Sequence, residues 1–123
     1  MPFRTAARRL LGTLPPGTGE HAILDFLLSN AAGAGNAKSW DAIETHCAGI
    51  AVTVDKLVFQ QGFLAQTRDG DVFIGACPKG YFIIQNRDDA LVAADFYRAR
   101  IAREQEHLTH LQDLVMRAGW PAI

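Results

Sequence analysis

The sequence predicts a mainly α-helical protein with a short β-hairpin, an α+β fold, that ends in one long helix. Three observations lead to this prediction. Residues 54–67 have a helical pattern and are followed at once by two short runs of β-branched and aromatic residues. Two shorter helical patterns precede them, each behind a residue that can cap a helix. No Pro or Gly interrupts the chain from Ala90 to Ala118.

Length and composition indicate one globular domain. The chain has 123 residues, of which 49% are apolar and 20% charged, enough to bury one core. The formal net charge of −1 counts against nucleic-acid binding, because domains that bind nucleic acids are usually basic. The distribution of charge therefore matters more than its sum. Residues 1–19 contain Arg4, Arg8 and Arg9 and no acid.

Neither a disulfide framework nor a membrane segment is expected. Cys47 and Cys77 are too few for a disulfide scaffold, and neither belongs to a CxxC pair. No apolar run approaches the roughly 20 residues that span a bilayer. Pro15 and Pro16 follow too soon after Leu10 for a signal-peptide core. We expect a cytoplasmic protein.

Residues 1–19 are predicted to form a flexible basic arm. Leu10, Leu11 and Leu14 could dock onto a core or form one helical turn, but Pro and Gly recur through the segment. The alternative is a disordered tail without a role.

Two capped helices are predicted next. Thr18 can cap a helix over residues 20–32, and the glycines of residues 33–36 end it. Ser39 can cap a second helix over residues 40–47. The apolar residues of each helix share one face: Ile23, Leu24, Leu27, Leu28 and Ala31 in the first, and Trp40, Ile43 and Cys47 in the second.

A third helix is predicted over residues 54–67, with Thr53 as its cap. Lys56 and Gln60 lie on its polar side with Thr67, and Phe59 and Phe63 lie at the margins. The face expected to be buried comprises Val54, Leu57, Val58, Leu64 and Ala65.

The hairpin is predicted from residues 72–75 and 81–84, joined by residues 76–80. Pro78 lies where no ladder donor is needed, and Gly80 where a positive φ is freely adopted. Lys79 is thereby placed at the hairpin tip, where it would contact a phosphate; the alternative is a charged turn that serves solubility.

A helix, a glycine-bearing turn, a second helix and then a hairpin are typical of a winged helix-turn-helix, here residues 20–86. In such a fold Lys56 and Gln60 would face the major groove of double-stranded DNA. The phosphates would be contacted by Arg68, Lys79, Arg4, Arg8 and Arg9. The alternative is that Lys56 and Gln60 form an ordinary solvated face.

The last helix is predicted over residues 87–119. Asn86 is its predicted cap, and Asp88 and Asp89 lie in its first turn. It contains a heptad-like seam that Glu104 interrupts: Ala94, Tyr97, Ile101, Glu104, Leu108, Leu111, Val115 and Ala118. We expect a homodimer, because a long helix with an apolar stripe requires a partner. The predicted interface comprises Tyr97, Ile101, Leu108, Leu111 and Val115. The alternative is that the helix folds back across the helix over residues 20–32.

The chain resembles a family of small phage and prophage winged-helix proteins. The resemblance is carried by residues 10–17, by Arg68 ahead of Gly70, by residues 72–75 and 78–82, and by Arg100. It implies a winged helix with a C-terminal helical extension that binds DNA in phage transcription regulation or replication. The third helix departs from that family, because it has one internal base where the family more often has arginines.

No enzyme and no cofactor are predicted. Glu104, His107 and His110 share a helical face, but the earlier helices supply no matching set of glutamates for a metal site. His46 and Cys47 with Cys77 do not complete four zinc ligands. No phosphate-binding loop, nucleophile elbow or dinucleotide fingerprint occurs in the sequence.

The sequence therefore supports two hypotheses. The first is a winged-helix DNA-binding protein, a phage or prophage type of regulator or replication accessory factor. The second is a degenerate winged helix that contacts a protein partner through Phe59, Phe63 and the long helix.

Overall fold

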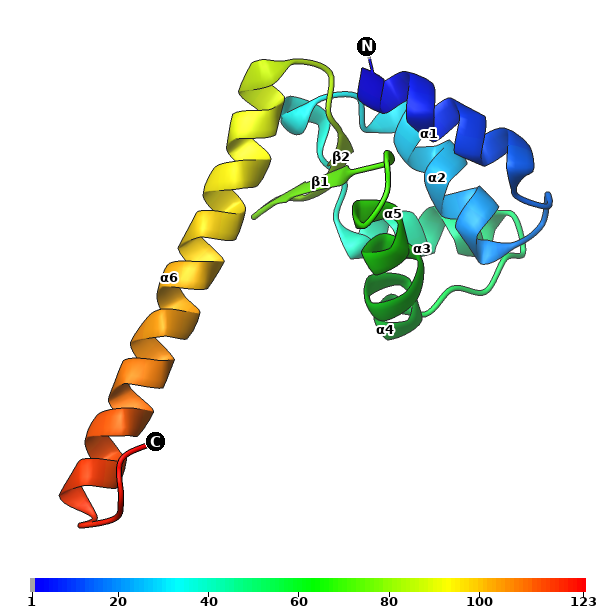
Figure 1. The fold of residues 1–123 in the computed structure, drawn as a ribbon. Coiled ribbons are helices and arrows are strands. Elements are labelled where there is room, and N and C mark those ends of the chain that lie inside the picture. Colours follow the sequence, from blue (N-terminus) through cyan, green and yellow to red (C-terminus); the bar gives the residue numbers. More distant parts are fainter. Residues whose placement is uncertain (1) are drawn as a thin grey trace. The chain divides into compact units, whose positions relative to one another are not determined.

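The computed structural model describes residues 2–123 and is mainly helical, with a two-stranded antiparallel hairpin and a long C-terminal helix, as the sequence predicts (Figure 1). The chain divides into two compact units, Met1–Ala93 and Ala94–Ile123. The elements in order are α1 (Pro2–Thr13), α2 (Gly19–Asn30), η1 (Ala34–Asn36), α3 (Trp40–Gly49), α4 (Lys56–Val58), η2 (Phe59–Leu64), α5 (Ala65–Arg68), β1 (Ile74–Cys77), β2 (Gly80–Ile83) and α6 (Arg87–Arg117).

The prediction of a flexible arm is wrong, because Pro2–Thr13 forms the helix α1, which packs against α2. Ala7 is buried, and four larger apolar side chains pack partly buried against the core: Phe3, Leu10, Leu11 and Leu14. These positions recur at intervals of three and four, which is the pattern of an amphipathic helix. The prolines are compatible with it because Pro2 lies at the first helical position and Pro15 beyond the last turn.

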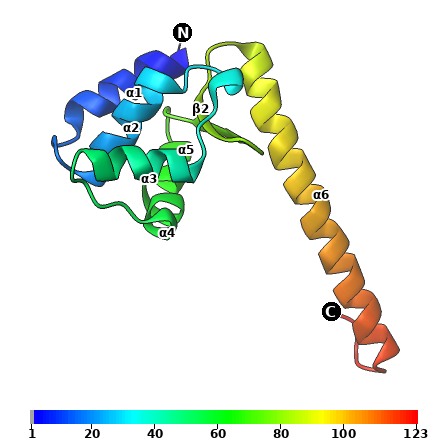
Figure 2. The same ribbon diagram turned by 180° about the vertical axis from the view of Figure 1, so that it is seen from behind.

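The predicted caps of α2 and α3 are confirmed. The Thr18 hydroxyl accepts a hydrogen bond from the His21 amide at 3.3 Å, and the Ser39 hydroxyl accepts one from the Ala42 amide at 3.2 Å. The two helices pack on each other (Figure 2). Their predicted apolar faces are buried: Ile23, Leu24, Leu27, Leu28 and Ala31 from α2 and its C-cap, and Trp40, Ile43 and Cys47 from α3.

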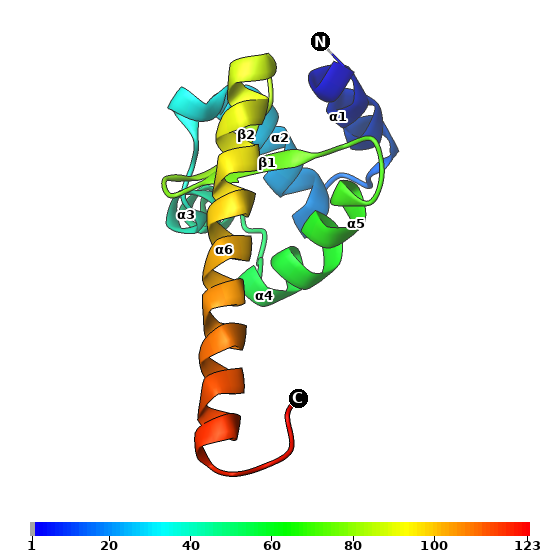
Figure 3. The ribbon, with the colours of Figure 1, turned by 60° about the vertical axis from the view of Figure 1, so that its left-hand side comes forward.

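The strand β1 begins two residues later than predicted, and β2 begins one residue earlier. Ile74 pairs with Ile83 and Cys77 with Gly80, so the turn is Pro78–Lys79 instead of residues 76–80. Gly75 therefore pairs with Phe82 instead of Tyr81, a change of register by one residue. The apolar runs 72–74 and 81–84 could not exclude it, because neither alternates with polar residues. The hairpin follows α5 through a short connection (Figure 3).

The connection between α2 and α3 pairs with the outer edge of β2. The Lys38 and Tyr81 backbones exchange two hydrogen bonds of 2.8 Å. The Ile83 amide donates to the Ala31 carbonyl, and the Gly33 amide donates to the Ile83 carbonyl, both at 2.8 Å. β2 is therefore bonded on both edges, and a segment that reads as a plain loop anchors the hairpin to the helices.

The start of α6 is tied to this connection. The Asn86 side chain accepts a hydrogen bond from the Asp89 amide at 2.9 Å, which confirms the predicted cap. The Asp89 carboxylate accepts bonds from the Ala34 amide at 3.0 Å and from the Gln85 amide at 2.9 Å. One acid thus fixes the direction in which the chain leaves β2.

The second unit, Ala94–Ile123, contains most of α6 and a short C-terminal turn. Beyond Gly119, which has a φ of +77°, the Trp120 amide donates to the Val115 carbonyl at 3.2 Å. The Gln112 amide side chain donates to the Ile123 carbonyl at 3.4 Å. Val115 is 7% exposed. The turn therefore covers the end of the helix on which it lies.

Gly75 is predicted to be essential for the hairpin. A Cβ at this position would lie 2.6 Å from the Phe82 ring, which is fully buried and cannot yield. Gly75→Ala should lower the free energy of unfolding by about 1–3 kcal/mol. Gly12→Ala is the matched control, because nothing lies within 4 Å and alanine favours the helix. Urea denaturation checks both; equal stability of the two variants would contradict the packing described.

Candidate nucleic-acid interface

The third predicted helix is present but begins later than expected. Asp55, not Thr53, is its cap, because the Asp55 carboxylate accepts a hydrogen bond from the Val58 amide at 2.9 Å. The helical stretch then runs from Lys56 to Arg68, and its middle part, η2, is a π-helix. π-helical turns are rare and occur often at functional sites.

The buried face of this helix differs from the predicted one. Leu57 and Val58 were expected in the core but are 58% and 70% exposed. Ala65 is exposed as well, and of the predicted face Leu64 is the residue that is buried. Phe59 is 3% exposed, so its large ring sets the rotation of the helix and turns its two preceding neighbours outward.

Phe59 lies at the centre of an aromatic junction formed by Trp40, Phe59, Phe63 and Tyr81. Its ring stacks on Trp40 of α3 with centroids 5.4 Å apart. It meets Tyr81 of β2 edge to face at 5.2 Å, and Phe63 one turn later at 6.4 Å. Such pairs add to the stability gained from burial alone. The junction fixes the helix against both α3 and the hairpin.

A hydrogen bond extends this junction to the surface. The Gln60 amide nitrogen donates to the Tyr81 hydroxyl at 2.9 Å. Lys56 is exposed one turn before Gln60, and Lys79 is exposed in the hairpin turn two residues before Tyr81. We call Lys56, Gln60, Lys79, Tyr81 and Lys38 the helix–hairpin surface. The structure thus brings three of the predicted DNA-binding residues to one region.

Lys38 is the member of this surface that sequence reasoning missed. Its backbone pairs with that of Tyr81, and its carbonyl lies against Gly80, where an added Cβ would clash with it. Lys38 therefore stands beside the turn that carries Lys79. No local pattern around Lys38 signals this position, because it results from pairing between segments far apart in the sequence.

Arg68 does not join this surface. Its Nε and Nη2 atoms donate to the Ile74 carbonyl at 3.1 and 2.9 Å. Its guanidinium also lies 5.3 Å from the centroid of the Phe73 ring. Arg68 is half-buried and links the end of α5 to β1. Its contacts are those of a structural residue.

The three arginines of the predicted arm are carried by α1. Arg4 is half-buried, and its Nη1 atom lies 3.5 Å from the Gln85 side-chain oxygen that accepts from it. Arg8 and Arg9 are exposed, and Arg9 lines a groove instead of the helix–hairpin surface. The structure therefore does not gather the seven predicted DNA-binding side chains in one place.

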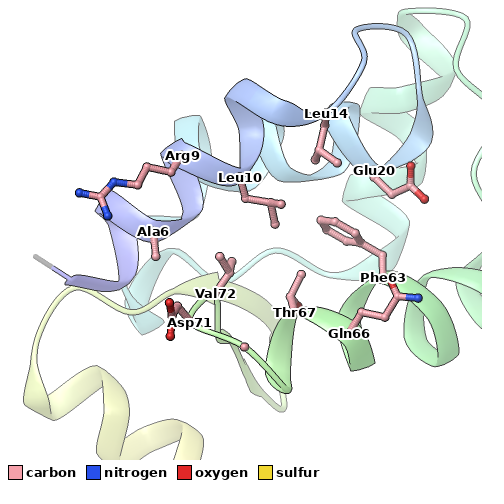
Figure 4. Close-up of a pocket in the computed structure, with 11 residues that line it drawn as sticks. Ala6, Arg9, Leu10, Leu14, Glu20, Phe63, Gln66, Thr67, Asp71 and Val72 are labelled. Carbon is pink, nitrogen blue, oxygen red and sulfur yellow. The ribbon is translucent and has the colours of Figure 1, made fainter.

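That groove, of about 540 Å³, lies between α1 and the α5 side of the unit (Figure 4). Its walls include Leu10, Leu14 and Phe63, and the charged side chains at its edge are Arg9, Glu20 and Asp71. A volume of this size is usual for small-molecule sites. The buried Thr67 hydroxyl, however, already donates to the Leu64 carbonyl at 2.9 Å, and the charged side chains are all exposed. The groove therefore holds no buried polar group aimed at a ligand.

Carboxylates also stand close to the aromatic junction. Asp41 and Glu44 are exposed on α3, and the Trp40 indole nitrogen donates to the Glu44 carboxylate at 3.3 Å. Asp55 is used as a cap. The basic helix–hairpin surface is thus bordered by acids, which limits the area over which it can attract a polyanion.

Cys47 and His46 of α3 have structural surroundings. Cys47 is fully buried, and this burial raises the pKa of its thiol above the ordinary value, so the reactive thiolate is disfavoured. The His46 ring stacks on Phe26 with centroids 4.4 Å apart.

Among residues 2–123, no three His, Cys, Asp or Glu side chains are grouped as metal ligands. Over the same residues, no helix has the length and apolar character that a membrane span requires.

Comparisons with protein-family models, with curated proteins and with solved structures found no match for this chain.

We predict that Arg68 stabilises the fold. Arg68→Met removes two charge-assisted hydrogen bonds to the Ile74 carbonyl and should lower the free energy of unfolding by about 1–3 kcal/mol. Lys79→Met removes the same charge from an exposed turn and should change stability by less than about 0.5 kcal/mol. Chemical denaturation compares them; a stable Arg68→Met variant would show that its contacts are dispensable.

Proposed function

We propose that the first unit is a winged helix-turn-helix domain that binds double-stranded DNA. The order of elements supports this: α2, the paired segment at Lys38, α3, the helix from Lys56 to Arg68, and then the hairpin of β1 and β2. In such folds the last helix before the hairpin enters the major groove and the hairpin follows the backbone. The setting implied by the resemblance is a phage or prophage type of regulator or replication accessory factor.

The observation that carries the proposal is the hydrogen bond between Gln60 and Tyr81. It links the polar side of the helix to the hairpin, so that base-reading and phosphate-binding groups belong to one surface. Gln60 supplies an amide of the kind that reads adenine, and the exposed Leu57 and Val58 supply apolar atoms of the kind that contact a thymine methyl.

Lys56, Lys79 and Lys38 would contact phosphates from this surface. Three such contacts imply a slope of about −2.7 in the dependence of log affinity on log salt concentration. The first unit has eight Lys and Arg against nine Asp and Glu, so its total charge does not attract DNA. Binding must therefore come from the local arrangement, and it should weaken strongly with salt.

The exposed Leu57 and Val58 favour a second candidate function, contact with a protein partner. Ile50, in the turn after α3, is 52% exposed as well. Phe59, which the sequence suggested for this role, is buried and is excluded from it. A partner would instead bind the start of α4, where the apolar Leu57 and Val58 follow the charged Asp55 and Lys56.

We predict that reversing two charges on the surface abolishes most DNA binding. Lys56→Glu combined with Lys79→Glu should lower affinity for any duplex by more than about tenfold and reduce the salt slope by about 1.8, because two phosphate contacts are lost. Fluorescence anisotropy with a labelled duplex across a salt series measures both quantities.

The control for this experiment is Arg8→Glu combined with Arg87→Glu. It makes the same change in net charge at two exposed positions outside the helix–hairpin surface. We expect its affinity to stay close to that of the wild type. Equal losses in the two double variants would mean that total charge governs binding and that the surface is misassigned.

Heparin chromatography separates the two candidate functions. A DNA-binding surface should retain the wild-type protein on heparin at low salt, because the resin presents a dense polyanion. The Lys56→Glu/Lys79→Glu variant should elute earlier than the Arg8→Glu/Arg87→Glu control. Passage of the wild type without retention would contradict DNA binding and favour a protein contact at Leu57 and Val58.

A further inference from the structure

The second unit presents apolar side chains that nothing in it covers. Ile101, Leu108 and Leu111 are 64%, 46% and 50% exposed on α6. They follow one another at intervals of seven and three, as the inner positions of a two-stranded coiled coil do. Glu104 occupies the inner position between Ile101 and Leu108.

The ends of the predicted seam differ from this middle part. Val115 was expected in a dimer interface but is covered by the C-terminal turn of its own chain. Tyr97 is half-buried, and the Arg100 guanidinium lies 5.9 Å from the centroid of its ring. The stripe that is open to a partner therefore runs from Ile101 to Leu111.

Charge is distributed unequally along this helix. The part before Glu104 carries Arg98, Arg100 and Arg103 against one acid, Asp95. The part from Glu104 onward carries three acids against one arginine: Glu104, Glu106 and Asp113, with Arg117. With neutral histidines, the first part has a net charge of +2 and the second a net charge of −2.

We propose that this stripe binds the same stripe of a second copy of the chain, with the two α6 helices antiparallel and centred near Glu106. Antiparallel pairing places the basic part of each helix along the acidic part of the other. Complementary charge of this kind selects one orientation over another. The helix dipoles are also opposed in this arrangement.

The register follows from the inner positions. Centring the pair at Glu106 sets Ile101 opposite Leu111 of the second copy at both ends of the stripe. Glu104 then faces Leu108 of the second copy, and its carboxylate can reach toward the flanking His107. A single acid on the seam lowers stability but fixes register, as polar groups at inner positions do in other coiled coils.

Parallel pairing in register is disfavoured by the same residues. It would set the two Glu104 carboxylates against each other at an inner position, where burial makes like charges costly. It would also align the basic parts of both helices. This proposal does not depend on DNA binding, because every residue that carries it lies in the second unit.

Sedimentation equilibrium from micromolar to millimolar concentrations tests the pairing. The wild type should dimerise, and Leu111→Glu should raise the dissociation constant at least about tenfold, because it buries an unpaired charge. Ala99→Glu adds the same charge at an exposed position on the opposite side of α6, where it stays in water, and should change the dissociation constant far less. A monomeric wild type over this range would overturn the proposal, as would equal effects of the two variants.

Spin-label distances test the orientation, using Arg117→Cys and Glu106→Cys in a Cys77→Ser background, where Cys47 is fully buried. In the antiparallel pair a label at 117 lies about 33 Å along the axis from its equivalent, whereas labels at 106 lie at the same level along the axis, on the outer faces of the two helices. The 117 pair should therefore be clearly farther apart than the 106 pair. Similar separations at both positions would indicate a parallel pair and overturn the assigned orientation.

Discussion

The packing of Phe59 is the constraint on which the first unit depends. Its buried ring contacts Trp40 on α3 and Tyr81 on β2, so three segments that are separate in the sequence meet at one side chain. An aromatic ring buries more apolar area than the aliphatic side chains next to it in this helix. The rotation of the helix from Lys56 to Arg68 is therefore decided by Phe59 rather than by the more numerous aliphatic residues around it.

The candidate site follows from that rotation. With Phe59 inward, Gln60 emerges beside the Tyr81 hydroxyl and can bond to it, while Leu57 and Val58 emerge into solvent. An aliphatic face turned inward would have hidden Leu57 and Val58 and separated Gln60 from the hairpin. The burial of Phe59 therefore both fills the core and exposes the polar and apolar groups that are proposed to contact DNA.

The sequence predicted those features that local chemistry decides. Thr18, Ser39 and Asn86 cap their helices because a side-chain oxygen near free amides is a local arrangement. Features set by distant contacts escaped prediction. The strand register is not fixed by apolar runs that lack alternation, the π-helix has no propensity signal, and Lys38 reaches the site through backbone pairing with Tyr81. The helix α1 escaped prediction because Pro and Gly lower helix propensity in general, whereas Pro2 and Pro15 lie at the first helical position and beyond the last turn, where they are tolerated.

Because Arg68 is bonded within the fold, DNA binding would have to rely on other cations for phosphate contacts. An arginine bonded twice to the Ile74 carbonyl strengthens the hairpin but leaves fewer cations for phosphates. Three lysines in one copy give weak attraction, and Asp41 and Glu44 border them. A paired α6 would link two such surfaces in one molecule, and linking two weak sites raises affinity well above that of either, provided that both can engage at once. The two proposals are therefore linked: the fewer phosphate contacts each copy makes, the more the proposed DNA binding would depend on pairing with a second copy.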